Sequence, residues 1–107
     1  MALTPATFHI LLALAQGERH GYAIMQDVAE QTADEIQLGP GTLYGSLKRL
    51  VDQGWIEETE KDEDGNERRR YYKLTRVGRS AAVAEAQRLA GAVRNARAIN
   101  LIGPERV

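Results

Sequence analysis

The chain has 107 residues, of which 43% are hydrophobic and 27% are charged, and its formal net charge is −1. A chain of this length forms one domain, or one domain with an appendage, and this composition excludes a disordered protein. The absence of cysteine excludes disulfides and cysteine-based zinc sites. No apolar run is long enough to span a membrane, and residues 1–5 lack the basic start of a signal peptide. We therefore expect a cytoplasmic protein.

Charge is distributed unevenly along the chain. Five acidic residues and one basic residue lie between Ala2 and Glu35, whereas residues 76–97 hold five arginines and one glutamate. Four basic residues and no acid lie between Arg68 and Lys73. A net charge near zero argues against a simple electrostatic nucleic-acid binder, but this asymmetry allows one positive surface.

Hydrophobic spacing predicts a first helix from about Leu3 to Ala15. Thr4 can cap its free N–H groups, and Pro5 is compatible with a first helical turn. A second apolar stripe, formed by Leu3, Ile10 and Leu14, lies beside the main one. Because a helix that is apolar on two sides is covered on two sides, we expect this helix to contact both the core and a second subunit.

Two more helices follow. The second is expected from about Gly21 to Thr32, and residues 38–41 carry a strong turn signal. The third is expected from about Thr42 to Gln53, and Gly54 ends it as a C-terminal cap. Three leucines form its buried stripe, namely Leu43, Leu47 and Leu50.

After Gly54 the pattern changes from helical to strand-like. Residues 55–60 and 69–74 are two candidate strands, joined by a hairpin turn at Asp64-Gly65. We expect Trp55 to anchor the core where the third helix leads into the first strand. Thr75 is a plausible cap for a last helix over residues 76–99. Its apolar side chains follow heptad spacing, which predicts a seam with a second helix: Ala82, Ala86, Leu89, Val93 and Ala96.

The order helix, helix, turn, helix, hairpin, long helix is typical of the winged helix-turn-helix, a mainly α fold of the α+β class. We expect residues 1–75 to form a winged helix-turn-helix DNA-binding domain and residues 76–107 to form a C-terminal dimerisation helix and tail. In this fold the last helix of the motif enters the major groove, while the hairpin reaches the adjacent backbone or minor groove.

Residues on the outer side of the third helix are candidates for contact with DNA. Gly45 leaves no side chain there, so a DNA backbone could come close, and Lys48 and Arg49 can reach phosphates or a guanine edge. Thr42 and Tyr44 can donate to phosphate oxygens near the helix start, where free N–H groups favour anions. The alternative interpretation is an ordinary solvated face, since any surface helix carries Lys and Arg.

The hairpin adds Arg68, Arg69 and Arg70 beside Asn66. Their guanidinium groups could grip a phosphate backbone or enter a minor groove. The acids at residues 62–64 and 67 leave open a second interpretation, in which the hairpin is solvated and neutralises itself.

Other kinds of site have little support in the sequence. His9 has no acidic or histidine neighbour at helical spacing, and His20 at a helix start is typical of a cap or a solvated residue, so we expect no metal site and no cofactor. No catalytic motif is present, and we expect no enzyme. A winged-helix protein interaction module without DNA binding is the alternative function that the net charge permits.

In order along the chain, several short motifs resemble those of the PadR family of transcriptional regulators. They are His20-Gly21-Tyr22, Gly41-Thr42-Leu43-Tyr44, Leu47-Lys48-Arg49-Leu50, Gly54-Trp55-Ile56, and Arg70 to Thr75 with Gly78. The resemblance implies a winged-helix homodimer that binds a palindromic operator in double-stranded DNA, commonly as a repressor. It implies that Tyr22, Thr42, Tyr44, Lys48, Arg49 and the hairpin arginines contact DNA, and that the last and first helices form the dimer.

The sequence departs from the family pattern in two places. Many relatives carry proline where this chain has Gly45, so the early turn of the third helix is expected to be looser. Some relatives stack flat drugs on a tryptophan of the last helix, but residues 76–107 contain no aromatic side chain, so that drug site is not carried over. The resemblance implies release by a small-molecule effector in some members, and the sequence identifies neither an effector nor the operator.

Overall fold

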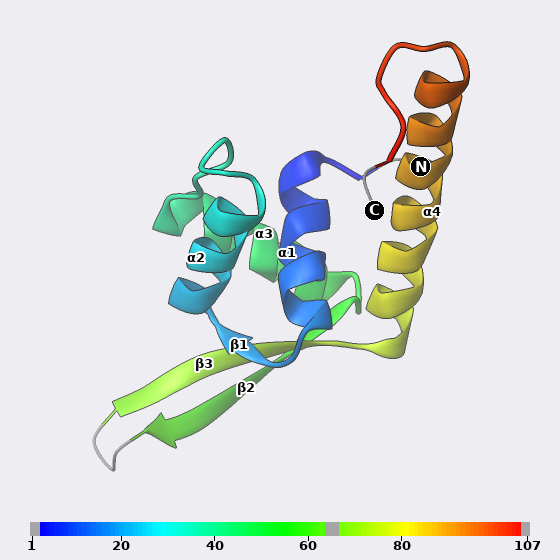
Figure 1. Ribbon diagram of the computed structural model, residues 1–107. Coiled ribbons are helices and arrows are strands. Elements are labelled where there is room, and N and C mark those ends of the chain that lie inside the picture. The colour runs from blue at the N-terminus through cyan, green and yellow to red at the C-terminus, as the bar shows by residue number, and fades with distance from the viewer. Residues whose placement is uncertain (1–2, 64–66, 106–107) are drawn as a thin grey trace.

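In a computed structural model, residues 3–63 and 67–105 are described, and they form four α-helices and a three-stranded antiparallel sheet (Figure 1). The helices are α1 (Pro5–Ala15), α2 (Gly21–Gln31), α3 (Pro40–Asp52) and α4 (Arg76–Ala98). The strands are β1 (Arg19–His20), β2 (Ile56–Glu63) and β3 (Glu67–Leu74). The predicted order of helices and hairpin is confirmed.

Helix ends follow the local chemistry of the sequence. The side chain of Thr4 caps α1 and that of Thr75 caps α4, each by accepting a hydrogen bond from a first-turn N–H, as predicted. Gly54 follows α3 with a φ of 78°, a backbone conformation that glycine adopts without strain. The start of α3 was predicted two residues too late: Gly39 is its N-cap residue and Pro40 lies in its first turn, where no intrahelical N–H is needed.

The sheet has the order β1-β3-β2. In the hairpin, both strands are longer than predicted and pair from Ile56 opposite Leu74 outward. Strand β1 was not predicted; its two residues pair with Tyr71 and Tyr72 of β3 and join the α1–α2 connection to the sheet. The predicted turn at Asp64-Gly65 lies outside the described residues.

The core lies where α1, α2, α3 and the inner ends of the strands meet. Its buried side chains come from all four helices and both long strands: Ile10, Leu11, Leu14, Ile24, Val28, Leu43, Leu47, Leu50, Ile56, Tyr72 and Ala82. The inward orientation predicted for the three leucines of α3 is confirmed. Trp55 is half-buried and packs against this core, as expected for an anchor at the start of the hairpin.

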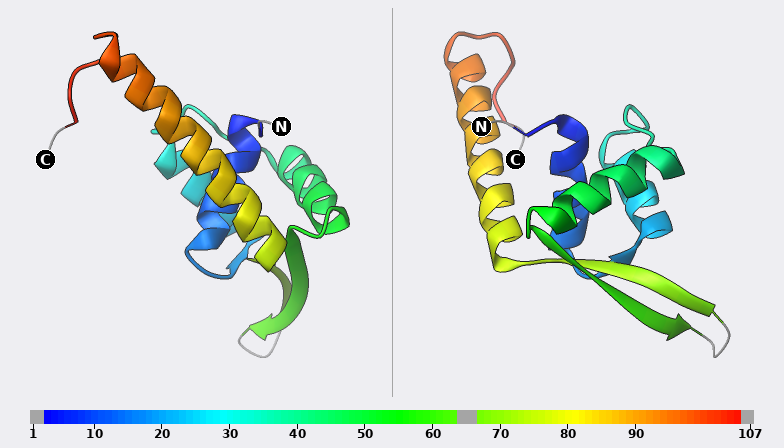
Figure 2. Two further views of the ribbon diagram at one scale, coloured as in Figure 1. Left: turned by 90° about the vertical axis from the view of Figure 1, so that its right-hand side faces the viewer. Right: turned by 180° about the vertical axis from the view of Figure 1, so that it is seen from behind.

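Two parts of the molecule project from this core (Figures 1 and 2). The hairpin of β2 and β3 extends to one side, and α4 rises on the other side with its C-terminal half beyond the body. Gly78 allows the first turn of α4 to pack against the backbone of Trp55, because a Cβ at this position would overlap the Trp55 carbonyl. Within the described residues, none of the helices combines the length and the apolar character that crossing a membrane requires.

Candidate nucleic-acid interface

The outer side of α3 presents Tyr44 and Lys48 on one face, since residues four apart in a helix are neighbours. Tyr44 is 45% exposed although it belongs to a large aromatic type that proteins usually cover. Lys48 is exposed and pairs with Asp52 one turn later, with Nζ and Oδ2 3.4 Å apart. Thr42 is exposed near the helix start, and Gly45 is half-buried.

A hollow of about 390 Å³ lies between the start of α2, the outer side of α3 and strand β3. Its lining residues are His20, Tyr22, Tyr44, Arg69 and Arg70. Four of these five were predicted to contact DNA, from three separate stretches of sequence. The fold therefore brings two phenol groups and two guanidinium groups to one place, and all four can donate hydrogen bonds to an anion.

Local structure explains how these side chains meet. Strand β1 pairs with β3, which places His20 opposite Tyr71 and directs the start of α2 toward the hairpin. The lack of a side chain at Gly21 lets the Tyr44 ring approach the α2 backbone, because a Cβ there would lie 2.9 Å from the ring atom Cζ. Tyr22 follows in the first turn of α2 and is 60% exposed.

His20 lines this hollow, which sequence reasoning missed, and it also forms the helix cap that was one of the roles expected for it. Its Nδ1 accepts a hydrogen bond from the backbone N–H of Ala23 at 3.2 Å and so caps α2. A neutral imidazole that accepts at Nδ1 carries its proton on Nε2. Nη1 of Arg69 lies 3.3 Å from that Nε2, so His20 connects the start of α2 with the hairpin.

The cations of the hairpin also face carboxylates. Nε of Arg70 lies 3.2 Å from Oε1 of Glu58, and the two side chains are 63% and 35% exposed. Tyr72 lies on the same strand as Arg70. Its burial, which is the largest influence, and the neighbouring Glu58 carboxylate both raise its pKa. Exposed ion pairs contribute at most about 1 kcal/mol, so a phosphate can replace such a carboxylate at little cost. The expectation of a partly self-neutralised hairpin therefore does not exclude an anion site.

The remaining predicted residues divide into two groups. Asn66 lies outside the described residues, and Arg68 lies in β3 opposite Asp62 with a side chain that is also outside the described part. Arg49 is exposed but lines a different surface from the hollow: its Nη2 donates to Oγ of Ser46 at 3.2 Å, beside α1 and α4. The structure thus unites Tyr22, Tyr44 and the two hairpin arginines, and separates Arg49 from them.

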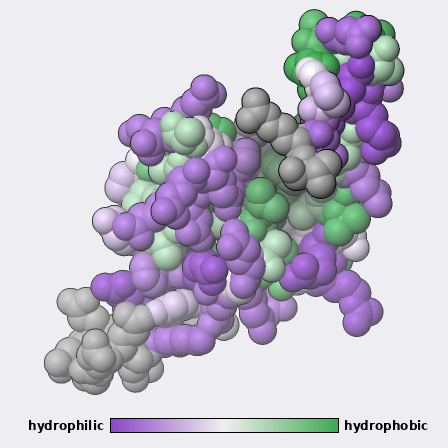
Figure 3. Space-filling view, in the orientation of Figure 1, coloured by the Kyte–Doolittle hydropathy of each residue, from purple (hydrophilic) through white to green (hydrophobic). Residues whose placement is uncertain are grey.

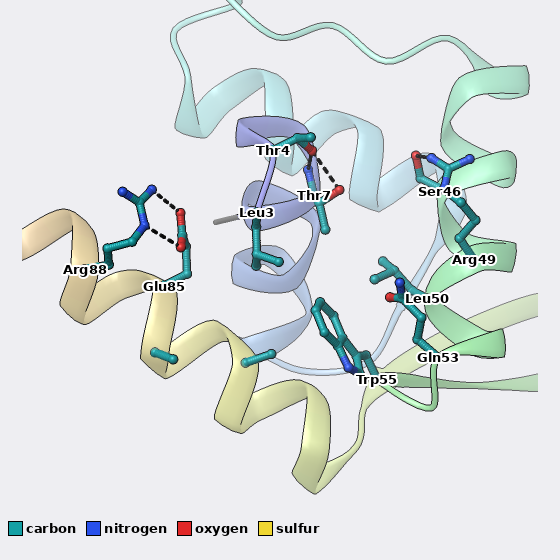
Figure 4. A pocket seen from close by; sticks show the side chains of 12 residues that line it. Leu3, Thr4, Thr7, Ser46, Arg49, Leu50, Gln53, Trp55, Glu85 and Arg88 are labelled. Atoms are coloured by element: carbon teal, nitrogen blue, oxygen red, sulfur yellow. Dashed lines mark hydrogen bonds and ion pairs between the residues drawn. The ribbon is translucent and has the colours of Figure 1, made fainter. Parts of the chain in front are cut away.

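Arg49 faces a cavity of about 560 Å³ between α1, α3 and α4 (Figure 4). Leu3, Leu50 and Trp55 form apolar walls, and the ring of Trp55 lies at the base of the cavity as drawn. On the α4 side, the buried Glu85 carboxylate accepts two hydrogen bonds from the guanidinium of Arg88, at 2.9 and 2.6 Å.

The ion pair between Glu85 and Arg88 shifts the pKa values of both groups. The hydrogen bonds from Arg88 lower the pKa of Glu85, and those same bonds raise the pKa of Arg88. Both groups therefore remain charged over the whole neutral range. The α4 wall of the cavity is neutral overall, so the Arg49 guanidinium on the α3 wall supplies a positive charge to the cavity.

Apolar side chains gather on the surface between α1 and α4 and at the far end of α4 (Figure 3). Leu89 and Val93 of the predicted seam are each 38% exposed on α4, Ala86 is exposed and Ala96 is half-buried. Leu3 is half-buried against the core and the cavity. Beyond α4, the chain exposes further apolar side chains, namely Ile99, Leu101 and Ile102.

Three residues of the predicted dimer surface require correction. Ile10 and Leu14 are 0% and 2% exposed, and Ala82 is 9% exposed, because all three pack in the core of the single chain. The second apolar stripe of α1 is covered by elements of the same protomer, since α1 contacts α2, α4 and β3 at once. These side chains are not on a surface that a second copy can contact without opening the core.

A family model described as the transcriptional regulator PadR-like family matches residues 10–84, from α1 into α4. The chain belongs to this family. Members of the PadR-like family are transcription regulators and not enzymes. Within the described residues, no group of three or more His, Cys, Asp or Glu side chains could hold a metal ion.

Individual relatives agree with the family assignment. This PadR-like chain is 33% identical to transcriptional regulator Rv3488 of Mycobacterium tuberculosis over 81 residues, which cover 76% of this chain and 72% of that one. Two further curated relatives are both uncharacterized, and the match with this chain spans 65% and 24% of their lengths.

Solved structures show the same winged-helix fold. A PadR family transcription regulator from hypervirulent Clostridium difficile R20291 is 26% identical and superposes with a TM-score of 0.78, over 90% of this chain and 98% of that chain. Bacillus subtilis PadR, solved in complex with operator DNA, is 22% identical with a TM-score of 0.67, over 94% of this chain and 49% of that chain. The predicted fold class is confirmed, including the long C-terminal helix.

Proposed function

We propose that this chain is a sequence-specific DNA-binding transcriptional regulator, a homodimeric repressor that binds a palindromic operator in the bacterial cytoplasm. The observation that carries the proposal is the hollow beside the outer side of α3, where β1, α2, α3 and β3 bring together His20, Tyr22, Tyr44, Arg69 and Arg70. Guanidinium and phenol groups that line one hollow can donate hydrogen bonds to an anion, and a DNA phosphate is the anion that a winged helix meets there.

In this proposal α3 enters the major groove and the hairpin crosses the neighbouring backbone. Lys48 and Tyr44 face the groove from α3, with Thr42 near the helix start. Arg69 and Arg70 hold a backbone phosphate in the hollow. Bacillus subtilis PadR, a protein of the same fold, was solved in complex with operator DNA, which supports duplex DNA as the partner.

Fluorescence anisotropy with labelled DNA tests the proposal. Arg70→Gln removes a phosphate contact, and we expect it to weaken binding and to reduce the slope of log affinity against log salt by about 1. Lys48→Gln is expected to cost about 1–3 kcal/mol if Lys48 reads a base. Arg94→Gln, with the same charge change on an exposed part of α4, serves as control. Equal losses in all three variants, or binding that does not change with salt, would contradict the proposal.

We propose that residues 1–75 bind DNA and that residues 76–107 form the dimer. A surface that combines Leu89, Val93 and the apolar tail is unusual for a monomer, and it supports contact with a second copy. We expect Leu89→Glu and Val93→Glu to yield monomers in size-exclusion light scattering. Val83→Glu, at an exposed position outside the seam, is the control. Dimers in both seam variants would remove the seam from the proposal.

The cavity in front of Trp55 is the site that we propose for an effector that releases DNA. Its volume of about 560 Å³ lies in the range of small-molecule sites. Arg49 favours a small anion with an apolar body, so benzoate and its neutral analogue benzamide are suitable probes. Trp55 is the single tryptophan of the sequence, so its fluorescence reports occupancy. Quenching by both probes alike, or quenching that survives Arg49→Gln, would contradict this site.

A winged-helix protein interaction module remains the second candidate. The observation that favours it is the pairing of hairpin and α3 cations with carboxylates, as in Arg70 with Glu58 and Lys48 with Asp52. Such a module would bind duplex DNA of any sequence weakly and without a preferred site. The anisotropy titration above therefore separates the two candidates.

A further inference from the structure

Glu18 lies in the connection between α1 and β1, yet it contacts the far strand of the hairpin. Its carboxylate accepts a hydrogen bond from Nζ of Lys61, and its Oε2 accepts one from Oγ1 of Thr59 at 3.4 Å. Strand β1 pairs with β3 and not with β2. Glu18 therefore reaches past the middle strand and links the body directly to β2.

Both ends of this link are held in place. On the body side, the next residue, Arg19, donates from Nε to Oδ2 of Asp27 in α2 at 3.2 Å, and from Nη1 to the backbone carbonyl of Glu18 at 3.0 Å. On the hairpin side, Nζ of Lys61 lies 5.2 Å from the centre of the Tyr71 ring. Alternate residues of a strand share a face, so Thr59 and Lys61 present their side chains on the same side of β2.

The hairpin otherwise has a narrow attachment to the body near its base. Strand β1 contributes two residue pairs and the contact of His20 with Arg69, and the outer part of β2 and β3 extends away from the helices (Figure 2). From Thr59 to Glu63 the strand is about 13 Å long at about 3.3 Å per residue. Arg69 pairs with Lys61, about 7 Å beyond Thr59, so a tilt of 10° at Thr59 would move the backbone there by about 1 Å, which takes a hydrogen bond to a phosphate out of its normal range.

We propose that Glu18 is a positioning residue for DNA binding, which holds the hairpin, through Lys61 and Thr59, at the angle where Arg69 and Arg70 meet the duplex that α3 reads. The inference rests on the proposed function, because it assumes that α3 and the hairpin bind one duplex. Glu18 itself does not contact DNA in this account.

Charge alone predicts the opposite effect of removing this carboxylate. An acid near a DNA-binding face repels phosphates, so its neutralisation should strengthen binding if nothing else changes. The hydrogen bond from Lys61 lowers the pKa of Glu18, so the carboxylate stays ionised at neutral pH and the link is present there. The positioning role predicts weaker binding in the neutral variant, and the sign of the change separates the two explanations.

The test compares Glu18→Gln with Glu57→Gln in the full chain. Glu57 lies on the same strand face as Thr59 and pairs with Lys73 of the neighbouring strand at 3.8 Å, so it makes the same charge change without linking the hairpin to the body. With an operator fragment that wild-type protein binds, we expect Glu18→Gln to weaken binding about fivefold to tenfold, as for one lost contact. Glu57→Gln should bind as tightly as wild type or more tightly. The reversed pair, Glu18→Lys with Lys61→Glu, should restore part of the loss.

A second measurement needs no DNA. Residual dipolar couplings of backbone amides in β2 and β3, referred to those of α1–α3, report the orientation of the hairpin in the free protein. We expect Glu18→Gln to change or average these couplings, and Glu57→Gln to leave them as in wild type.

The outcomes distinguish this inference from the proposed function. If wild-type protein binds DNA but Glu18→Gln binds equally or more tightly, the positioning role is wrong and the regulator remains. If wild-type protein does not bind DNA, the proposed function is wrong, and the positioning role for DNA binding is overturned with it. Couplings that are identical in Glu18→Gln and wild type would overturn the mechanical link by themselves.

Discussion

Gly78→Ala tests the contact between α4 and the base of the hairpin. A Cβ at this position would overlap the backbone carbonyl oxygen of Trp55 and would lie 2.8 Å from its carbonyl carbon and 3.1 Å from its Cα. Carbon atoms in contact prefer a separation of about 3.5 Å or more, so the carbonyl carbon alone requires one backbone to retreat by about 0.7 Å, and the overlapping oxygen requires more. That retreat would also strain the hydrogen bond of 3.0 Å from the Thr75 N–H to the Trp55 carbonyl.

The expected magnitude follows from three contributions. Overpacking costs about 1–3 kcal/mol, and a weakened buried backbone hydrogen bond costs about 1 kcal/mol more. The higher helix propensity of alanine offsets about 1 kcal/mol of this cost. We therefore expect Gly78→Ala to lower the free energy of unfolding by about 1–3 kcal/mol.

Gly91 in the same helix supplies the matched control. A Cβ there would meet Nη2 of Arg94 at 3.5 Å, which is an ordinary contact. We expect Gly91→Ala to raise the free energy of unfolding by about 0.5–1 kcal/mol. Urea unfolding followed by Trp55 fluorescence measures both variants at one protein concentration. If Gly78→Ala proves as stable as Gly91→Ala, the close approach of α4 to Trp55 is not what requires glycine.

Three further changes test other parts of the fold. Thr75→Ala removes the cap of α4 and should lower the free energy of unfolding by about 1–2 kcal/mol. Thr75→Ser keeps a capping hydroxyl and should retain most of the wild-type stability. Leu47 is 1% exposed, so Leu47→Ala should lower the free energy of unfolding by about 2–5 kcal/mol. Leu12, which is 37% exposed, is the control, and an equal loss in Leu12→Ala would contradict the core assignment. Arg88 lowers the pKa of Glu85 below its ordinary 4.5, so the stability from this pair is present above pH 4.5 and is lost as pH falls through the lowered value. In urea unfolding from pH 7 to pH 3, the free energy of unfolding of Glu85→Gln should therefore fall less steeply with pH than that of wild type. An unchanged slope would show that the Glu85–Arg88 pair does not contribute to stability.

Features of the fold that depend on neighbouring residues could be predicted from the sequence. The caps at Thr4 and Thr75, the glycine after α3, and the buried leucines of α3 are set by interactions within one or two helical turns. Strand β1 has only two residues, so it has no periodicity to recognise, and it exists because β3 pairs with it. The link from Glu18 to the hairpin and the place of His20 in the hollow follow from that pairing and could not be found beforehand, whereas the cap that His20 forms was one of the roles expected for it.

Errors about contacts arose where one pattern has two structural explanations. The two apolar stripes of α1 are compatible with a subunit contact or with a helix in the middle of its own domain, and Ile10 and Leu14 follow the second. Arg49 and Lys48 are adjacent in sequence, and their directions on α3 differ by about 100°. That rotation is enough to place Arg49 at the cavity beside α4 while Lys48 stays on the outer face.

Selection of bound sequences from a random duplex DNA pool tests the central claim most directly. We expect enrichment of a two-fold symmetric motif whose half-sites lie about one helical turn, or 10–10.5 base pairs, apart, because two copies of α3 would read successive major grooves. Arg69→Gln with Arg70→Gln should reduce the enrichment. A pool that shows no preferred sequence with the wild-type protein, under low salt and at concentrations that saturate binding, would contradict the assignment of α3 and the hairpin to DNA recognition.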